Sequence, residues 1–393
     1  MTGLSARLRA ALYGHPRIAW AVGLGICGVV VSYLFAFRTD GGDFYPNWRA
    51  ARAVLDGMPA YARYDWPFPY LYPPGFLLPM MPFAMLDFHV ANRVFFVVNL
   101  FGLGLGAIWC MRLCRLPLRS PITPLVLGLL SLTPPVLITL IQGNVNGLLL
   151  AGEGAFLLLA SRHRWGRAGV ALGLTLLVKP LLLPLLLVPI LWRRLDTLLI
   201  AVAVPIAVSI LALPMLRDGG AFLTSAVPYL LRGETGNQLG NTSIAGTFAL
   251  LHLPLWSSIA VRGVIVVAGG AAVLRTVRRG ELGLIHITAV ALLVAFLGFS
   301  FSSQYFALYL LPLLLSAGLP GTWMAGPLPW IGAYLLDGPD LFLFYRLGKT
   351  LGVGPAIGTV RSALGYAVLL LALVLAAWRQ APVTAVTDPL PRG

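Results

Sequence analysis

Apolar segments close to twenty residues long recur along this chain, and short arginine-rich loops separate them. A helix needs about 20 apolar residues to cross the hydrocarbon core of a bilayer. Among the 393 residues, 59% are hydrophobic and only 10% are charged, whereas about 25% are charged in a typical soluble domain. Uninterrupted apolar runs such as residues 181–191 lack the in–out alternation of a transmembrane barrel strand. The chain is therefore predicted to be an all-α polytopic membrane protein.

The basic loops set the predicted topology, because lysine and arginine concentrate on the cytoplasmic side of a membrane. We expect one transmembrane domain over residues 1–378, with about 10–12 transmembrane or re-entrant helices. A short cytoplasmic tail follows over residues 379–393. Two loops, 38–92 and 217–258, lie on the outer side, the first with helices at the membrane interface. The predicted spans include 18–37, 93–111, 122–141, 197–216, 259–274, 283–300, 306–318, 322–336 and 357–378.

The formal net charge of +15 is also typical of proteins that bind nucleic acid. Here the basic residues lie between apolar segments, where they set topology, so no nucleic-acid partner is predicted. Of the 13 acids, nine fall in the two outer loops above or in a further predicted outer loop at 337–355, and Glu153 alone lies in the middle of a span. This one-sided distribution favours chemistry at the outer membrane surface over a charged pathway through the membrane.

Residues 168–192 form an unusual segment, because basic residues flank the segment on both sides and Lys179-Pro180 interrupts its middle. Two half-length helices in a re-entrant hairpin would keep both basic clusters in the cytoplasm. A charged residue at membrane depth is tolerated only where it faces protein or water. Lys179 is therefore either a functional cation or a structural lysine, paired for example with Glu153.

The first outer loop begins with two carboxylates, Asp40 and Asp43, directly after the first span. An acid at the interface can accept a proton from a hydroxyl group, although such a residue can also be a solvated turn acid. Arg49 and Arg52 follow on an amphipathic stretch, residues 47–57, that suits a helix on the membrane surface. These arginines can bind a substrate phosphate or contact lipid head groups.

Two further clusters, one aromatic and one polar, can each be interpreted in two ways. The aromatic residues of the first outer loop suit an interfacial belt or a sugar-binding surface. The tip that joins the third and fourth spans can bind a sugar or cap helix ends. The aromatic cluster is Tyr61, Tyr64, Trp66, Phe68, Tyr70 and Tyr72, and the tip residues are Gln142, Asn144 and Asn146.

The order of short motifs resembles the family-87 glycosyltransferases, which include polyprenol-phosphate-mannose-dependent α-mannosyltransferases. The resemblance covers about residues 38–318. The motifs that carry it are Asp43-Phe44, Ala50-Ala51, Leu55, Gly57, Tyr61, Tyr72-Pro73-Pro74, Gln142-Gly143-Asn144, Lys179-Pro180, Asn241-Thr242-Ser243, and Ser302 with Tyr305.

The resemblance implies a GT-C membrane fold and a hexosyltransferase that uses a sugar linked to a polyprenyl phosphate. Mannose is the first expectation, with arabinose or another sugar also open. The acceptor would be a hydroxyl of a lipid or an envelope glycan, reached on the outer side and glycosylated with inversion. Such an enzyme would be a multi-pass protein of the plasma (inner) membrane, with its active site facing the periplasm or cell exterior. No nucleotide sugar, cofactor or metal is expected.

Roles for individual residues follow from the same resemblance. Asp43 matches the family's proposed general base, and Lys179 is the cation expected to face the leaving phosphate. Gln304 departs from the family pattern, which commonly has histidine just before the tyrosine, so no imidazole role transfers. The expected substrate-binding residues are Asp40, Arg49, Arg52, Tyr72, Gln142, Asn144, Lys179, Asn241, Gln304 and Tyr305, with no metal ligand.

Two other classes of protein share parts of this pattern. A transporter or flippase would need charges and broken helices along a path through the midplane, often in repeated halves. A polymerase or ligase of envelope glycans also uses polyprenyl-linked donors, but would not require Asp43 to follow the first span directly.

Overall fold

A computed structural model describes residues 14–62, 70–232, 240–277, 280–337 and 356–379, and the regular structure in these ranges is helical. Five helices are long and apolar enough to cross a bilayer, and a bent pair could form a sixth span. The predicted all-α polytopic membrane protein is thereby confirmed. The predictions for Tyr64, Trp66 and Phe68, and for the tail beyond residue 379, lie outside the described residues.

The long helices follow the predicted spans closely, with early starts at Phe88 and at Leu255, the latter four residues before the predicted span 259–274. The first outer loop ends sooner than expected, because the next helix begins at Phe88, five residues before the predicted span. Asp87 caps this helix by accepting a hydrogen bond from the backbone N–H of His89 at 2.9 Å. The long helices are α2 (Pro16–Phe37), α5 (Phe88–Leu113), α11 (Leu195–Ala212, continued by η3, Leu213–Met215), α14 (Leu255–Thr276) and α19 (Ala356–Arg379).

Shorter helices fill the space between the long ones. They are α3 (Phe44–Leu55), η1 (Pro74–Phe76), α4 (Leu77–Ala84), α8 (Asn146–Ser161), α9 (Trp165–Val178), η2 (Pro180–Leu186), α10 (Leu187–Leu191), η4 (Phe222–Ala226), α12 (Val227–Arg232), α13 (Ile244–Leu250), α15 (Gly280–Gly298), η6 (Gln304–Leu310), α16 (Leu311–Leu315), η7 (Ser316–Gly318), η8 (Trp323–Ala325) and α17 (Pro327–Asp337).

The span predicted over 122–141 is not one straight helix, which corrects the sequence prediction. It consists of α6 (Ile122–Ser131) and α7 (Pro134–Gln142), which are bent by 58° at their junction. Pro134 and Pro135 explain the bend, because proline disfavours a helical residue before it and cannot donate a helical hydrogen bond. The outer end of α7 is therefore free to turn toward the loop that follows α2.

The interruption predicted at Lys179-Pro180 is present. Helix α9 ends at Val178, Lys179 adopts an extended backbone, and Pro180 opens η2. The two pieces, Trp165–Val178 and Pro180–Leu191, are each shorter than a bilayer-spanning helix. The break leaves the Lys179 side chain beside other elements of the bundle rather than on a continuous helix surface.

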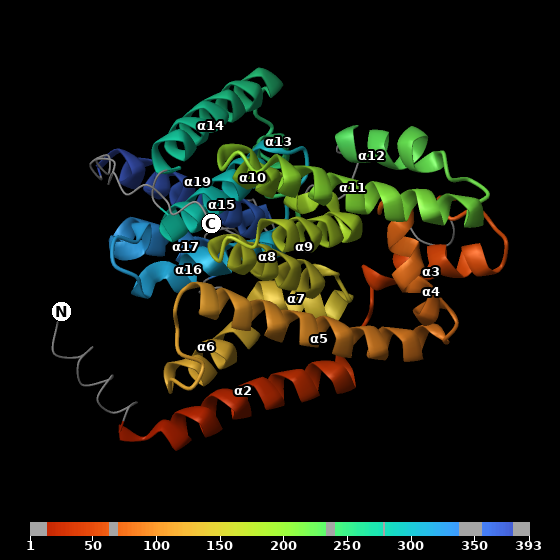
Figure 1. The fold of residues 1–393 in the computed structure, drawn as a ribbon, viewed down its shortest axis with the longest axis horizontal. Coiled ribbons are helices and arrows are strands. Elements are labelled where there is room, and N and C mark those ends of the chain that lie inside the picture. Colours follow the sequence, from red (N-terminus) through yellow and green to blue (C-terminus); the bar gives the residue numbers. More distant parts are fainter. Residues whose placement is uncertain (1–13, 63–69, 233–239, 278–279, 338–355, 380–393) are drawn as a thin grey trace.

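The helices form a layered bundle in which α2 and α14 occupy opposite edges (Figure 1). Helix α2 packs on α6, α5 packs on α8, and α9 lies against both α8 and α11. Gly102 and Gly106 of α5 make the close contact with α8 possible, because a Cβ atom at either position would come within 2.8 Å of α8 atoms. Small residues in this spacing let two membrane helices approach closely.

The two predicted outer loops are joined by one carboxylate. Asp218 accepts hydrogen bonds from the backbone N–H groups of Ala60 at 2.9 Å and Tyr61 at 2.7 Å. The Tyr61 hydroxyl in turn donates to the carbonyl of Tyr72 at 2.9 Å. A continuous set of hydrogen bonds therefore runs from the second loop to the backbone of Tyr72.

Candidate active site

Asp43 lies where the outer ends of several helices meet. It immediately precedes α3, and its backbone N–H donates to the carbonyl of Gln142 at 2.8 Å. One carboxylate oxygen accepts a hydrogen bond from the side-chain amide of Asn144 at 2.5 Å. The residue is half-buried, so its carboxylate is oriented by the protein and remains partly accessible.

The turn before Asp43 is held against the end of α7. The backbone N–H groups of Asp40 and Gly41 both donate to the carbonyl of Ile141 at 3.2 Å. Gly41 has φ +70°, and a Cβ atom there would lie 2.7 Å from the side chain of Asn92. A glycine is therefore required at this position by both conformation and space.

Asn144 is held in place by a residue of α5, Asn99. The Asn99 side chain donates to the backbone carbonyl of Asn144 at 2.5 Å and accepts from the N–H of Gly147 at 2.8 Å. Asn99 is fully buried, and Asn144 is only 2% exposed. The partner of Asp43 therefore sits on a loop whose backbone is bound to a membrane helix.

Removing Asn99 tests this support. Asn99→Ala should lower the stability of the protein by about 1–3 kcal/mol, because the Gly147 N–H and Asn144 carbonyl lose a buried partner. It should also lower kcat, because Asn144 no longer holds Asp43. Thermal melting and turnover, measured together on the same preparation, give both readouts.

Ser316→Ala is the matched control. Ser316 is fully buried, and within the described ranges its hydroxyl bonds the carbonyl of Leu313 at 2.6 Å and the hydroxyl of Thr322 at 3.0 Å rather than a residue around Asp43. This variant should lower the melting temperature and leave kcat unchanged. Equal loss of kcat in the two variants would mean that Asn99 acts only through overall stability.

Asn47 and Tyr72 flank the carboxylate. Asn47, 1% exposed, donates to the backbone carbonyl of Asp43 at 2.9 Å, and its side chain lies beside that of Tyr72. Burial, and then the negative charge of Asp43, raise the pKa of Tyr72 above its ordinary value of 10.0. The Tyr72 hydroxyl therefore remains protonated at neutral pH and can donate a hydrogen bond next to Asp43.

Lys179 brings a positive charge to the same place. Its ammonium nitrogen lies 5.8 Å from the ring centroid of Tyr72 and 5.5 Å from that of Phe306. Burial disfavours the charged form of Lys179, and the negative charge of Asp43 favours it. Pairing with Glu153 is not found, since both carboxyl oxygens of that fully buried residue lack a hydrogen-bond partner within the described ranges.

Tyr305 completes the cluster from the segment that follows α15. Its side chain lies beside those of Ser303 and Asn144, within the electrostatic influence of Asp43 and Tyr72. The site thus draws Asp43, Tyr72, Asn144, Lys179 and Tyr305 together from five separate segments of the chain.

This arrangement suits proton transfer next to a developing negative charge. A carboxylate held by one amide can accept a proton, and an ammonium group flanked by aromatic rings can stabilise an anion. The surrounding phenols and amides supply directional hydrogen bonds. Within the described ranges, no three His, Cys, Asp or Glu side chains lie together as a metal ion would require.

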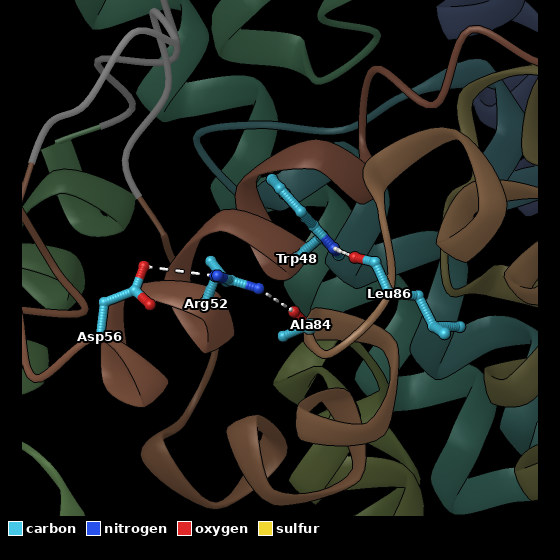
Figure 2. A network of polar contacts seen from close by, with 5 residues as sticks. All are labelled: Trp48, Arg52, Asp56, Ala84 and Leu86. Atoms are coloured by element: carbon cyan, nitrogen blue, oxygen red, sulfur yellow. Dashed lines mark hydrogen bonds and ion pairs between the residues drawn. The ribbon is translucent and has the colours of Figure 1, made fainter.

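Arg52 lies apart from this cluster and joins α3 to the connection between α4 and α5 (Figure 2). Its guanidinium bonds the carboxylate of Asp56 and the carbonyl of Ala84, each at 3.3 Å, while the Trp48 indole donates to the carbonyl of Leu86 at 3.2 Å. This network anchors α3, the helix that directly follows Asp43. Arg49, on the same helix, also has interactions of its own.

Asn241 connects two segments through its side chain. Its amide nitrogen donates to the carbonyl of Ser300 at 2.8 Å, and its oxygen accepts from the N–H groups of Ser243 at 3.1 Å and Ser302 at 3.0 Å. Both polar atoms are therefore occupied within the protein, and the residue supports the segment that leads to Tyr305.

The remaining predicted residues make other contacts. The Gln304 side-chain amide donates to the carbonyl of Leu336 at 3.0 Å, at the end of α17. Gln142 contributes its backbone carbonyl, described above. Asp40 is exposed and accepts a hydrogen bond from the N–H of Gly42 at 3.0 Å.

Sequence reasoning missed three residues that shape the site, Asn47, Asn99 and Phe306. Asn47 follows Asp43 at a spacing of four, which places both on one helix face. Asn99 is a polar residue inside an apolar span, and such residues commonly mark a functional or packing site. Phe306 follows Tyr305 within an aromatic segment, and its sequence position alone does not relate it to Lys179.

The fold and site together define a multi-pass helical membrane protein with a carboxylate and a cation at the meeting point of its loops. Comparison with known proteins places this chain in a specific family. The model of "Glycosyltransferase family 87" matches residues 70–303, and the chain belongs to that family. It is a membrane glycosyltransferase of this family.

Relatives with assigned activities extend over most of the chain. An alpha-(1->3)-arabinofuranosyltransferase of Mycobacterium tuberculosis (strain H37Rv) is 33% identical over 379 residues, covering 89% of this chain and 86% of its own length. Proteins of the same name from Mycolicibacterium smegmatis and Corynebacterium glutamicum are 31% and 29% identical, each covering 78% of this chain and 73% and 74% of their own lengths. No solved structure matches this chain significantly.

Proposed function

We propose that this protein transfers an arabinofuranosyl residue from a polyprenyl phosphate to a hydroxyl of a lipid or envelope glycan. The arabinofuranosyltransferase relatives support this sugar, and they do not support the mannose expected first from the sequence. The observation that carries the proposal is the Asp43 carboxylate, held by Asn144 and close to the charge of Lys179. The only phosphate that the proposed transfer step uses is that of the polyprenyl donor, and the step needs no cofactor and no metal.

The proposed reaction is a single displacement. Asp43 removes the proton of the acceptor hydroxyl while the acceptor oxygen forms a bond to the anomeric carbon. The bond between that carbon and the phosphate oxygen breaks, and its electron pair leaves with the polyprenyl phosphate. Lys179 stabilises the negative charge that develops there. The proton ends on Asp43 and the configuration of the sugar is inverted, as one-base displacement requires.

The proposal also fixes the configuration of the donor and the side of the membrane. Because the relatives are named for an α linkage, an inverting enzyme that forms that linkage needs a β-linked donor. The predicted topology and the acids of the outer loops support a location in the plasma (inner) membrane, with the active site facing the periplasm or cell exterior. Substrates and products would then remain in the outer leaflet.

The test is a comparison of donors with the purified protein in nanodiscs and a native membrane lipid extract as acceptor. The radiolabelled donors are β-linked polyprenyl-phosphate arabinofuranose, β-linked polyprenyl-phosphate mannose and a nucleotide-linked arabinose. The first should label a glycolipid at least about tenfold faster than the second, the third should give no product, and EDTA should change nothing. Faster transfer of mannose, or transfer from the nucleotide sugar, would contradict the proposed donor.

A further inference from the structure

A groove that encloses about 810 Å³ runs along the C-terminal half of α2, next to α5 and α7. Its wall is apolar, and its mouth carries charged and polar side chains. Val29, Val30, Tyr33, Leu34, Ala36 and Phe37 come from α2, with Leu137 and Ile141 from α7. At the mouth lie Arg38, Thr39, Asp40, His89, Asn92 and Arg93.

The groove is open toward the side of the bundle. Val29 is 72% exposed and Phe37 is 75% exposed, and α2 forms one edge of the protein (Figure 1). An apolar wall with this exposure, on a helix long enough to span a bilayer, faces lipid chains. A membrane lipid can therefore enter the groove sideways.

The mouth of the groove carries excess positive charge. Arg38 and Arg93 are opposed by one carboxylate, that of Asp40, and neither arginine is paired with a carboxylate within the described ranges. Arg38 donates from its Nε atom to the Tyr33 hydroxyl at 3.3 Å, and Arg93 lies 6.0 Å from the ring centroid of Phe35. Guanidinium groups are well suited to bind a phosphate through several N–H groups.

This mouth is distinct from the cluster around Asp43. The lining of the groove includes neither Asp43 nor Asn144 nor Lys179. Asn92 packs against Gly41 and Gly143 at the end of the groove nearest Asp43. A phosphate at Arg38 and Arg93 is therefore not the one that leaves beside Lys179.

The groove nevertheless lies within reach of the reacting hydroxyl. Asp40 is three residues from Asp43, so their Cα atoms are at most about 11 Å apart. A lipid phosphate at the mouth of the groove would place the head group attached to it beside the turn that carries Asp43. The acceptor hydroxyl must lie on that head group if Asp43 is to deprotonate the hydroxyl.

We infer that the α2–α5–α7 groove binds the lipid anchor of the acceptor, with its chain on the apolar wall and its phosphate on Arg38 and Arg93. The acceptor is thus a glycan carried by a lipid through a phosphodiester. The inference rests on the proposed function for the identity of the acceptor, but binding of a phosphodiester lipid can be measured without transfer.

The binding test uses the full-length protein in phosphatidylcholine nanodiscs that contain a photoactivatable phosphatidylglycerol. Cross-links should map to residues 29–37 of α2 and 137–141 of α7. They should fall at least about fivefold in the double variant Arg38→Gln/Arg93→Gln and in Val30→Trp, which fills the apolar wall. Arg112→Gln, an exposed arginine at the other end of α5, is the matched control and should keep wild-type labelling.

Two further arms separate this inference from the proposed function. Asp43→Asn should keep the lipid labelling while it abolishes transfer. Loss of sugar transfer can therefore be distinguished from loss of lipid binding in the groove. In the active protein, the double variant should raise KM for the lipid extract at least about fivefold and leave KM for the polyprenyl-phosphate donor unchanged. Labelling that survives the double variant, or a rise in the donor KM instead, would overturn the assignment of the groove to the acceptor.

Discussion

Asp43→Asn should abolish sugar transfer, with a loss of kcat of about 10²–10⁴-fold, which is the range expected when a general base is removed. The amide cannot accept the proton of the acceptor hydroxyl, although it is nearly the same size as the carboxylate. The fold should remain intact, because the backbone N–H of Asp43 still bonds Gln142. Steady-state turnover and thermal melting in the same nanodisc preparation would show both effects.

Two other aspartates provide the controls for that experiment. Asp87→Asn changes an outer-side carboxylate at a helix N-terminus, where asparagine caps as well as aspartate, and should leave turnover unchanged. Asp40→Asn should have a milder effect than Asp43→Asn, because Asp40 lies in the groove rather than beside Lys179. Equal losses at Asp40 and Asp43, with both proteins folded, would remove the general-base role from Asp43.

Lys179→Met should lower kcat by about 10²–10³-fold, comparable to the loss of one group that stabilises a developing oxyanion. Methionine has a similar length, fills the space between Tyr72 and Phe306, and carries no charge. Removing one partner of a charge pair is costly where the other charge is left buried and uncompensated, but the Asp43 carboxylate is partly accessible and keeps its hydrogen bond from Asn144. The melting temperature should therefore change little while turnover falls.

Lys179→Arg separates charge from general packing at this position. Arginine keeps the positive charge but differs in shape and hydrogen-bond geometry, so part of the activity should return relative to the methionine variant. Single-turnover kinetics with the polyprenyl-phosphate donor would show whether the chemical step is affected. Unchanged turnover in Lys179→Met would show that the leaving phosphate does not depend on Lys179.

The architecture was predictable where composition decides it. Apolar length identified α2, α5, α11, α14 and α19 within a few residues, because the bilayer imposes a minimum on each span. Lys179-Pro180 predicted a break in the helical segment, since proline cannot continue the hydrogen bonding of a helix. The bend at Pro134 was not anticipated, although the same rule applies, because the surrounding residues remain apolar throughout.

The candidate site was only partly predictable for a different reason. Asp43, Asn144 and Lys179 carry chemistry that marks them in the sequence, and they lie together. Arg52 and Asn241 carry similar chemistry, but they bond backbone carbonyls or N–H groups of distant segments. Which polar side chains bind substrate and which support the fold depends on contacts between residues far apart in the sequence.

The most direct test of the account is the configuration of the glycosidic bond that the wild-type protein forms from a synthetic β-linked polyprenyl-phosphate arabinofuranose. The purified glycolipid product would be analysed by NMR at the new anomeric centre. A single displacement with Asp43 as the base predicts an α linkage in all of the product. A β linkage would mean that configuration is retained, which requires two displacements and contradicts the mechanism proposed for Asp43 and Lys179.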